Sequence, residues 1–196
     1  MDVLVATTNP GKLREIEVIL EGVPVRLHTL AEFPGVEEPE ESGATFEENA
    51  RLKALYYSAA TGMLTAADDS GLEIDALGGA PGVHSARWHG SDYEFKFQKI
   101  REALDAQGLS TSPARFVCCV AVADNGGVIY ETRGTIEGRI ADAPLGTNGF
   151  GYDPIFFYPP LGLTLAQLDR DQKSHVSHRG KAFAALREWL APRVQQ

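Results

Sequence analysis

The residues Asp124-Asn125-Gly126-Gly127 lie between two apolar runs and limit the folds that this chain can adopt. Asn-Gly at such a position favours a two-residue turn that joins antiparallel strands. We therefore expect residues 114–123 and 128–130 to form a β-hairpin, and residues 134–140 to continue as a strand. At least part of the sheet is then antiparallel.

The first twenty residues carry a different signal. A short apolar run at residues 3–6 is followed by loop residues, and then by apolar residues at helical spacing between Leu13 and Leu20. This order predicts a strand, a loop and a helix. Because strand and helix signals mix along the chain and an antiparallel hairpin is present, we predict an α/β fold with a mixed central β-sheet flanked by helices.

Capping residues and apolar spacing predict the remaining elements. Thr45 and Glu48 match a capping box, in which the Thr45 hydroxyl accepts a backbone N–H and Glu48 reaches back, so a helix should run to about Thr61. Residues 64–67 are a predicted strand that delivers Asp68-Asp69-Ser70 to its C-terminal end. The other predicted elements are a rigid turn at 78–82, a helix at 92–107, an apolar segment at 155–157, and a last amphipathic helix that opens in residues 173–181 and is stopped by Pro192.

The length and the charge of the chain limit its organisation and its partners. For 196 residues we expect a single domain over residues 1–196 with two lobes around a substrate cleft. The chain carries 18 Lys and Arg against 27 Asp and Glu, a formal net charge of −9. Its average field repels phosphate backbones and anionic membranes, so we expect no nucleic-acid partner and no membrane association. A local basic pocket is compatible with this charge.

Cysteine usage and the lengths of apolar runs bear on location. Cys118 and Cys119 are adjacent, and neighbours in a strand point to opposite faces, so the pair suits neither a disulfide nor a metal site. No apolar stretch approaches 18 residues, and residues 1–6 lack the basic start and long apolar core of a signal peptide. We therefore expect a cytoplasmic protein.

The loop Thr7-Thr8-Asn9-Pro10-Gly11-Lys12 lies between the first predicted strand and helix. A helix start offers free backbone N–H groups and the positive end of the helix dipole, and Lys12 adds a charge, so the segment suits a phosphate. It lacks the upstream glycine and the following Ser or Thr of the GxxxxGK[ST] loop. An ordinary strand-to-helix turn with an exposed lysine is the alternative.

Two acidic segments contain candidate metal ligands. One is the predicted loop Glu37–Glu41, and the other is the pair Asp68-Asp69. Mg²⁺ takes oxygen ligands, commonly one or two protein carboxylates beside water and substrate phosphates. Because successive strand residues face opposite sides, Asp68 and Asp69 should differ in role. A turn at residues 68–71 and a solvated acidic loop are the alternatives.

The segment Lys173–Lys181 concentrates basic side chains in an otherwise anionic chain. Arg179 can bind a phosphate or a base carbonyl through its planar fork, and Ser177 can cap a helix. Cations at a helix N-terminus oppose the helix dipole unless an anion lies there, which points to an anionic ligand. A solvated helix start is the alternative.

Glycines flank an aromatic residue in Gly149-Phe150-Gly151-Tyr152-Asp153-Pro154. Such a loop lets a ring lie flat against a planar ligand while backbone groups approach the edge of that ligand, as recognition of a nucleobase requires. A core aromatic residue in a tight bend is the alternative. The sequence shows no Ser-His-Asp or Cys-His nucleophile set.

Together these segments resemble one family in order and spacing. The matching stretches are Thr7–Lys12, Glu40–Gly43 leading into Phe46–Ala50, Ala67–Leu72, Leu77–Gly82, Gly149–Pro154 and Ser177–Arg179. Over nearly its full length the chain is similar to the non-canonical purine nucleoside triphosphate pyrophosphatases, the inosine triphosphate pyrophosphatase (ITPase) or dITP/XTP pyrophosphatase family. Thr8 departs from the pattern, since many relatives carry Gly there.

The resemblance implies an activity and a fold. It implies an ITPase-like hydrolase that cleaves the α–β phosphoanhydride of ITP, dITP or XTP, releases the monophosphate and pyrophosphate, and so cleanses the nucleotide pool. It further implies Mg²⁺ as cofactor, a metal-activated water that attacks the α-phosphorus, and a homodimer.

The resemblance also implies roles for individual residues. Asp69 matches the catalytic base and a metal ligand, and Glu41 matches a loop glutamate that shares the metal, with Glu38 and Glu40 left open as alternatives. His178 and Arg179 match the pair that contacts the purine. The implied substrate-binding residues are Thr7, Thr8, Asn9, Pro10, Gly11, Lys12, Ser70, Phe150, Gly151, Tyr152, Asp153, Lys173, His178 and Arg179.

Two other functions stay open. The chain could be a pyrophosphatase for another nucleotide, such as a modified pyrimidine, or a nucleotide-binding sensor that does not hydrolyse its ligand. Asp68, Asp69 and the acidic loop disfavour the sensor, because a simple anion binder has little use for carboxylates beside phosphates unless a metal is present.

Overall fold

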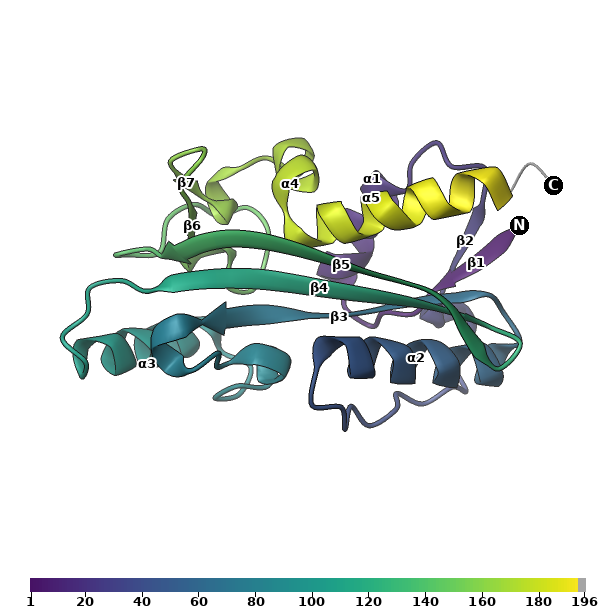
Figure 1. Cartoon of the computed structure of the whole chain (residues 1–196), viewed down its shortest axis with the longest axis horizontal. Coiled ribbons are helices and arrows are strands. Elements are labelled where there is room, and N and C mark those ends of the chain that lie inside the picture. The colour runs from purple at the N-terminus through teal and green to yellow at the C-terminus, as the bar shows by residue number, and fades with distance from the viewer. Residues whose placement is uncertain (194–196) are drawn as a thin grey trace.

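A mixed β-sheet of seven strands runs through the computed structural model, which describes residues 1–193 (Figure 1). The strand order is β2-β1-β3-β4-β5-β6-β7. β1 is parallel to β2 and β3, and all other neighbours are antiparallel. The strands are β1 (Asp2–Val5), β2 (Arg26–Thr29), β3 (Thr65–Ile74), β4 (Pro113–Asp124), β5 (Gly127–Ile140), β6 (Phe156–Tyr158) and β7 (Leu163–Thr164).

Helices cover both faces of this sheet, which confirms the predicted fold class. In Figure 1, α2 and α3 lie on one side of β3 to β5, and α4 and α5 lie on the other. The helices are α1 (Pro10–Ile19), α2 (Phe46–Thr61), α3 (Tyr93–Asp105), α4 (Arg170–Val176) and α5 (His178–Leu190). Short 3₁₀ turns lie at Leu30–Glu32, Asp75–Leu77, Gly82–His84, Asp153–Ile155, Leu165–Gln167 and Ala191–Arg193.

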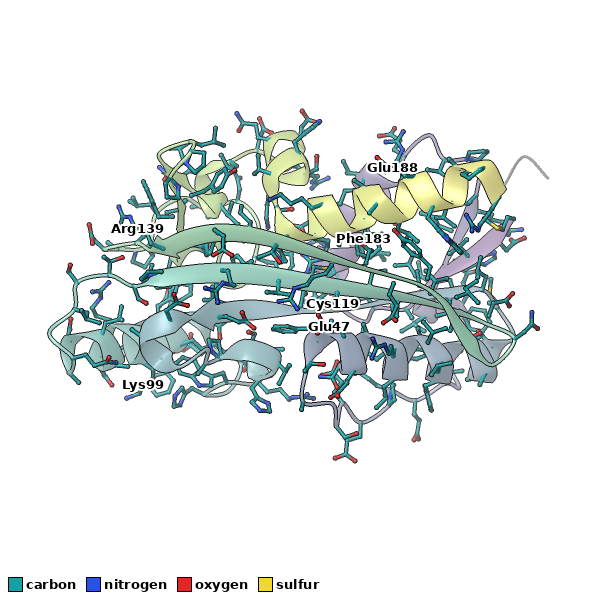
Figure 2. The ribbon with its side chains drawn as sticks, in the orientation of Figure 1. Glu47, Lys99, Cys119, Arg139, Phe183 and Glu188 are labelled. Carbon is teal, nitrogen blue, oxygen red and sulfur yellow. The ribbon has the colours of Figure 1, made fainter. Side chains whose placement is uncertain are left out.

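The two cysteines show how the sheet separates its two faces. Cys118 belongs to the same apolar cluster as Phe183 of α5. Cys119 belongs to the cluster between the sheet and α2 (Figure 2). Both thiols are buried and free. Neighbouring β4 residues therefore point to opposite faces, as the strand period requires. Among residues 1–193, no helix is both long and apolar enough to cross a membrane.

The predicted hairpin is confirmed. β4 and β5 pair antiparallel from end to end, and the turn residues Asn125 and Gly126 both have positive φ, at 47° and 82°. These torsions match the tight turn that suits the right-handed twist of paired strands. Residues 127–140 form one continuous strand, with a register shift opposite it between Val122 and Ala123.

The N-termini of two helices are set by side-chain caps. Asn9 caps α1, because its Oδ1 accepts hydrogen bonds from Gly11 N (2.8 Å) and Lys12 N (3.2 Å). Thr45 caps α2 as predicted, accepting from Glu48 N at 3.2 Å. The other half of the predicted capping box is wrong by one residue, since Glu48 Oε2 accepts from Ala44 N (2.6 Å). The backbone before Thr45 turns so that the Ala44 N–H, and not that of Thr45, points at the Glu48 carboxylate.

β3 differs most from the prediction. It continues to Ile74 and pairs with β4 throughout, so Asp68, Asp69 and Ser70 lie in mid-strand instead of at the C-terminal end. Asp, Ser and Gly prefer turns locally, but β4 offers an uninterrupted partner. The hydrogen-bond ladder therefore outweighs the local turn preference.

The predicted last helix is in fact two helices. Ser177 ends α4 and caps α5, and its Oγ accepts from Gly180 N at 3.0 Å. Lys173 thus belongs to α4, while His178 and Arg179 open α5. The extended backbone of Ser177 (φ −69°, ψ 160°) breaks the helical path. α5 approaches β5 closely at Gly134, where a Cβ atom would overlap the His178 carbonyl.

Candidate functional site

The site begins where β1 ends beside the longer β3. β1 pairs with β3 only at Leu4 and Val5, opposite Thr65 and Ala66. Beyond this point, no strand in the described part of the chain pairs with that edge of β3. Asp68, Asp69 and Ser70 follow directly along the open edge. The Asp68 carboxylate is therefore within reach of Lys12 in the first turn of α1, and the Asp69 carboxylate is within reach of Asn49 and Lys53 of α2.

Asp68 faces a cluster of cations. Its Oδ2 lies 2.9 Å from Lys12 Nζ and 3.7 Å from Arg179 Nη2, and the Ser70 hydroxyl donates to it at 3.2 Å. Burial alone would raise the pKa of Asp68, but the charges of Lys12, Arg179 and Lys53 outweigh burial and hold that pKa far below its usual range. Asp68 is therefore ionised and neutralised by its neighbours.

Asp69 faces the opposite side of the strand and has weaker partners. Asn49 Nδ2 donates to Asp69 Oδ2 at 3.1 Å, and Lys53 Nζ lies 3.4 Å from Asp69 Oδ1. Burial raises the pKa of Asp69, and the nearby Lys53 and Lys12 charges offset this only in part. The surroundings of the two aspartates therefore differ, while their predicted difference in role stays a prediction.

Glu41 joins the Asp69 side of the site. Its Oε1 lies 2.7 Å from Lys53 Nζ and its Oε2 lies 2.7 Å from Arg87 Nη2. Lys53 is therefore the cation on which Glu41 and Asp69 converge. Of the two alternative glutamates, Glu38 accepts instead from the Thr8 hydroxyl at 3.4 Å.

Glu15 of α1 holds the basic residues of the C-terminal helices. One of its carboxylate oxygens lies 2.6 Å from Lys173 Nζ, and the other lies 2.6 Å from Arg179 Nη1. Lys173 also pairs with Asp153, whose Oδ2 accepts from Phe150 N at 2.8 Å. The first helix and the glycine-rich loop thus fix the directions of both cations.

Gly149 shapes the glycine-rich loop. Its φ of +71° favours glycine, and a Cβ atom there would overlap the Asp153 carboxylate. The loop can therefore close tightly over Asp153 and Lys173. It places the Phe150 ring 5.0 Å from Lys173 Nζ and 5.6 Å from the Arg179 guanidinium carbon.

One pocket brings ten of the predicted substrate-binding residues together. They are Asn9, Lys12, Ser70, Phe150, Gly151, Tyr152, Asp153, Lys173, His178 and Arg179. The wall is completed by Gly71, Ser85, Ala86, Tyr93 and Phe116. The pocket is thus rich in cations on one part of its wall and aromatic on another.

Two buried atoms in this pocket lack partners. Among residues 1–193, His178 Nδ1 and Arg179 Nε are the buried side-chain polar atoms without a hydrogen bond. The His178 ring stacks on Phe116 with centroids 4.6 Å apart. Burial lowers the pKa of His178 well below its usual value, and Arg179 and Lys173 lower it further, so the imidazole is neutral. Such orphaned groups are rare in proteins, and both atoms are free to hydrogen-bond a water or a polar ligand in the pocket.

Four predicted residues lie outside this pocket. Thr7, Thr8 and Pro10 line a separate hollow beside residues 29–36, and Gly11 lines a cavity that adjoins Glu15. The amides of Gly11 and Lys12 are capped by Asn9, so the expectation that both are free for a phosphate is wrong. The Asn9 side chain, and not a bound anion, accepts the hydrogen bonds of these two amides.

Three residues that contact predicted site residues were not predicted from the sequence. They are Asn49 and Lys53, which contact Asp69, and Glu15, which contacts Lys173 and Arg179. Asn49 and Lys53 lie one helical turn apart on the face of α2 that buries Ala50, Ala54 and Tyr57. Polar residues on an otherwise apolar helix face are the signal that could have identified the first two. Glu15 gave no comparable signal, because its partners are more than 150 positions away.

The donor set fits a magnesium ion. No group of three or more His, Cys, Asp or Glu side chains arranged for a metal occurs within residues 1–193. Asp69 and Glu41 nevertheless bring two carboxylates to a common point at Lys53. Mg²⁺ commonly takes only one or two protein carboxylates and completes its shell with water and phosphate oxygens.

Comparison with known proteins assigns a family. The model of the Ham1 family matches residues 3–189. A dITP/XTP pyrophosphatase of an Exiguobacterium species is 45% identical over 98% of both chains, and that of Geobacter sulfurreducens is 47% identical over 95% of both. The solved HAM1 protein of Coxiella burnetii superposes with a TM-score of 0.89 at 40% identity, covering 98% of this chain and 99% of the other. With a match across almost every described residue in sequence and in fold, the chain belongs to the Ham1 family.

Proposed function

We propose that this protein hydrolyses non-canonical purine nucleoside triphosphates, namely ITP, dITP and XTP, to the monophosphate and pyrophosphate. The observation that carries the proposal is a pocket with orphaned polar atoms whose cation Lys12 pairs with Asp68, next in the strand to Asp69, which shares Lys53 with Glu41. Its Ham1-family relatives named dITP/XTP pyrophosphatases support the choice of substrate.

The cations are suited to bind the triphosphate chain. Lys12 and Lys173 line one pocket, and a carboxylate partner fixes the direction of each. Fixed cations in a largely buried site stabilise developing negative charge at little cost in reorganisation. They would hold the phosphates in the ground state and stabilise the pyrophosphate as it leaves.

Asp69 is suited to act as the base. In the proposed step, a water oxygen forms a bond to the α-phosphorus while the bond from that phosphorus to the bridging oxygen breaks. The proton of the water passes to Asp69, and the electron pair of the broken bond leaves with pyrophosphate. Asn49 donates its amide to Asp69 Oδ2 and so orients the carboxylate that accepts the proton.

We propose that Mg²⁺ is the cofactor and that Asp69 and Glu41 hold it. When bound, the ion would neutralise phosphate charge and make the attacking water more acidic. Lys53 occupies the space between the two carboxylates and keeps them close together at neutral pH. Asp69 and Glu41 thus provide the acidic site, and Lys12 and Lys173 provide the opposing cations.

Selection of the nucleobase rests on the free Nε–H donor of Arg179, next to the neutral imidazole of His178. The Arg179 Nε–H is a buried donor without a partner, and a purine 6-oxo group accepts a hydrogen bond that the adenine amino group cannot. Rejection is strong when the wrong ligand leaves a buried polar group unpaired. We therefore expect ATP to be a poor substrate.

A pyrophosphate-release assay with ITP, XTP, dITP, GTP and ATP, with and without Mg²⁺, tests this function. Turnover of the first three above ATP is expected. Equal turnover of ATP and ITP would contradict the proposed base selection, preference for a modified pyrimidine would favour the alternative pyrophosphatase, and tight ITP binding in excess Mg²⁺ without product would favour a sensor.

We further propose that the enzyme is a cytoplasmic homodimer and that residues 1–196 act as one domain with two lobes. The two free thiols support a reducing compartment. The long strands β3 to β5, which run the length of the sheet, support a single domain. The predicted absence of a nucleic-acid partner rests on the net charge of −9.

A further inference from the structure

Lys96 of α3 is a buried lysine that the proposed reaction does not use. Its side chain is fully enclosed, at 0% exposure. Its Nζ donates to two backbone carbonyls, Ser85 O at 3.1 Å and Ala86 O at 2.8 Å. It also lies over the Tyr93 ring, 4.2 Å from the centroid. Buried lysines are rare in proteins unless they are paired.

In the described residues 1–193, no carboxylate pairs with the Lys96 ammonium. Lys12, Lys173 and Arg179 each contact an acidic side chain, whereas within residues 1–193 Lys96 makes no ion pair. Burial lowers the pKa of Lys96, while the two carbonyls and the aromatic rings favour the ammonium form. The contacts of Lys96 therefore leave its positive charge without a compensating anion.

The groups that hold Lys96 also form the pocket wall. Ser85, Ala86, Tyr93 and Tyr152 line the pocket, and the Tyr152 hydroxyl donates to Ser85 O at 2.9 Å. The Tyr152 ring lies 5.6 Å from Lys96 Nζ. The charge therefore lies directly behind the part of the wall that Ser85, Ala86, Tyr93 and Tyr152 form.

A positive charge behind the pocket wall attracts an anionic purine ring more strongly than an uncharged one. Xanthine carries a second oxo group, which makes its ring a much stronger acid than hypoxanthine, so near neutral pH much of the xanthine is anionic. In a buried site, opposite charges attract over several ångströms with little screening. On the basis of the proposed function, we propose that Lys96 is a specificity-determining residue that favours an anionic purine ring, such as that of XTP, over the uncharged ring of ITP or dITP.

The test compares kcat/KM for XTP with kcat/KM for ITP in variants of the full chain. Lys96→Met and Lys96→Gln remove the charge, and Lys96→Arg retains it. We expect the XTP-to-ITP ratio to fall about 3- to 10-fold in the first two and to be kept by Lys96→Arg. A purely structural role would lower both activities together and leave the ratio unchanged.

Lys99→Met is the matched control. Lys99 lies three residues further along α3, is partly exposed, and pairs with Glu102 at 2.6 Å (Figure 2). Its loss should leave the ratio as in the wild type. Thermal unfolding of each variant shows whether it is folded, and Lys96→Gln carries the test if Lys96→Met does not fold.

A binding measurement separates this inference from the proposed function. Calorimetric affinities for the monophosphates XMP and IMP need no hydrolysis, and the XMP-to-IMP affinity ratio should fall in Lys96→Gln as the kinetic ratio does. If the wild type hydrolyses neither nucleotide, the proposed function fails while this ratio still tests Lys96. Unchanged ratios in both charge-removing variants would overturn the inference.

Discussion

Asp68 and Asp69 are neighbours in one strand, yet their surroundings differ in almost every respect. Asp68 lies against Lys12 and Arg179, which hold its pKa far below the usual range against the effect of burial. Asp69 points to the other face, where one amide and one more distant ammonium contact it, and burial raises its pKa. Asp68 is thus stabilised as a charge, whereas Asp69 remains able to take up a proton.

This difference shows how a sheet can place a structural and a reactive carboxylate side by side. The period of a strand turns the two side chains to opposite faces, and each face is covered by different helices. Lys12 of α1 and Arg179 of α5 contact Asp68. Asn49 of α2 donates a hydrogen bond to Asp69. One substitution at each position should therefore have a different consequence.

The largest expected effect is the loss of activity in Asp69→Asn. Removing the proposed base should lower kcat for ITP by about 10² to 10⁴. The unfolding free energy should not fall, because a carboxylate whose pKa is raised by the fold opposes folding when ionised. Steady-state pyrophosphate release and urea unfolding measure the two quantities, and a near-wild-type kcat would remove Asp69 from the mechanism.

The reverse pattern is expected for Asp68→Asn. This change leaves Lys12 and Arg179 without their shared anion, and removal of one partner of a buried ion pair costs about 3–5 kcal/mol. Urea unfolding without divalent metal should show this loss. Stability equal to that of Asp69→Asn would break the contrast between the two faces.

The pH dependence of stability should follow Asp68. Its pKa is lower in the folded chain than in the unfolded chain, so the unfolded state binds more protons and stability falls as the pH decreases. This contribution is complete above the ordinary aspartate pKa of about 3.9 and is lost below it, on the order of 2 kcal/mol. Unfolding curves at several acidic pH values, in EDTA, should show a smaller acid loss in Asp68→Asn than in the wild type.

The smallest of these effects is expected for Glu15→Gln. Glu15 is not in contact with either aspartate but fixes Lys173 and Arg179, so its loss should misplace the cations and lower kcat/KM about 10-fold. Restoration of activity by Glu15→Asp would support a positioning role. An unaffected kcat/KM would show that the cations are held without α1.

Much of the fold could be predicted from local signals. The Asn125-Gly126 turn and the Thr45 cap act through residues close in sequence, and both are confirmed. The middle of β3 could not be predicted this way, because Asp68-Asp69-Ser70 has the local preferences of a turn. Its strand conformation depends on β4, about fifty positions away, and on cations from both ends of the chain.

Site residues could be predicted where a single short segment contains the residue types that a ligand requires. The glycine-rich loop at Phe150 and the basic pair His178-Arg179 are examples, and both line the pocket. Glu15 could not be found from local patterns, since its partners Lys173 and Arg179 are brought close only by the fold. The expectation that the Gly11 and Lys12 amides are free to bind a phosphate was wrong, because the Asn9 side chain accepts hydrogen bonds from both.

The most direct test of the divided roles is the kcat of Asp69→Asn and Asp68→Asn with ITP and Mg²⁺, measured side by side at a temperature where both variants are folded. We predict that Asp69→Asn is the slower enzyme although it is the more stable protein. An Asp69→Asn enzyme that turns over faster than Asp68→Asn would contradict the assignment of the chemistry to the α2 face of the strand.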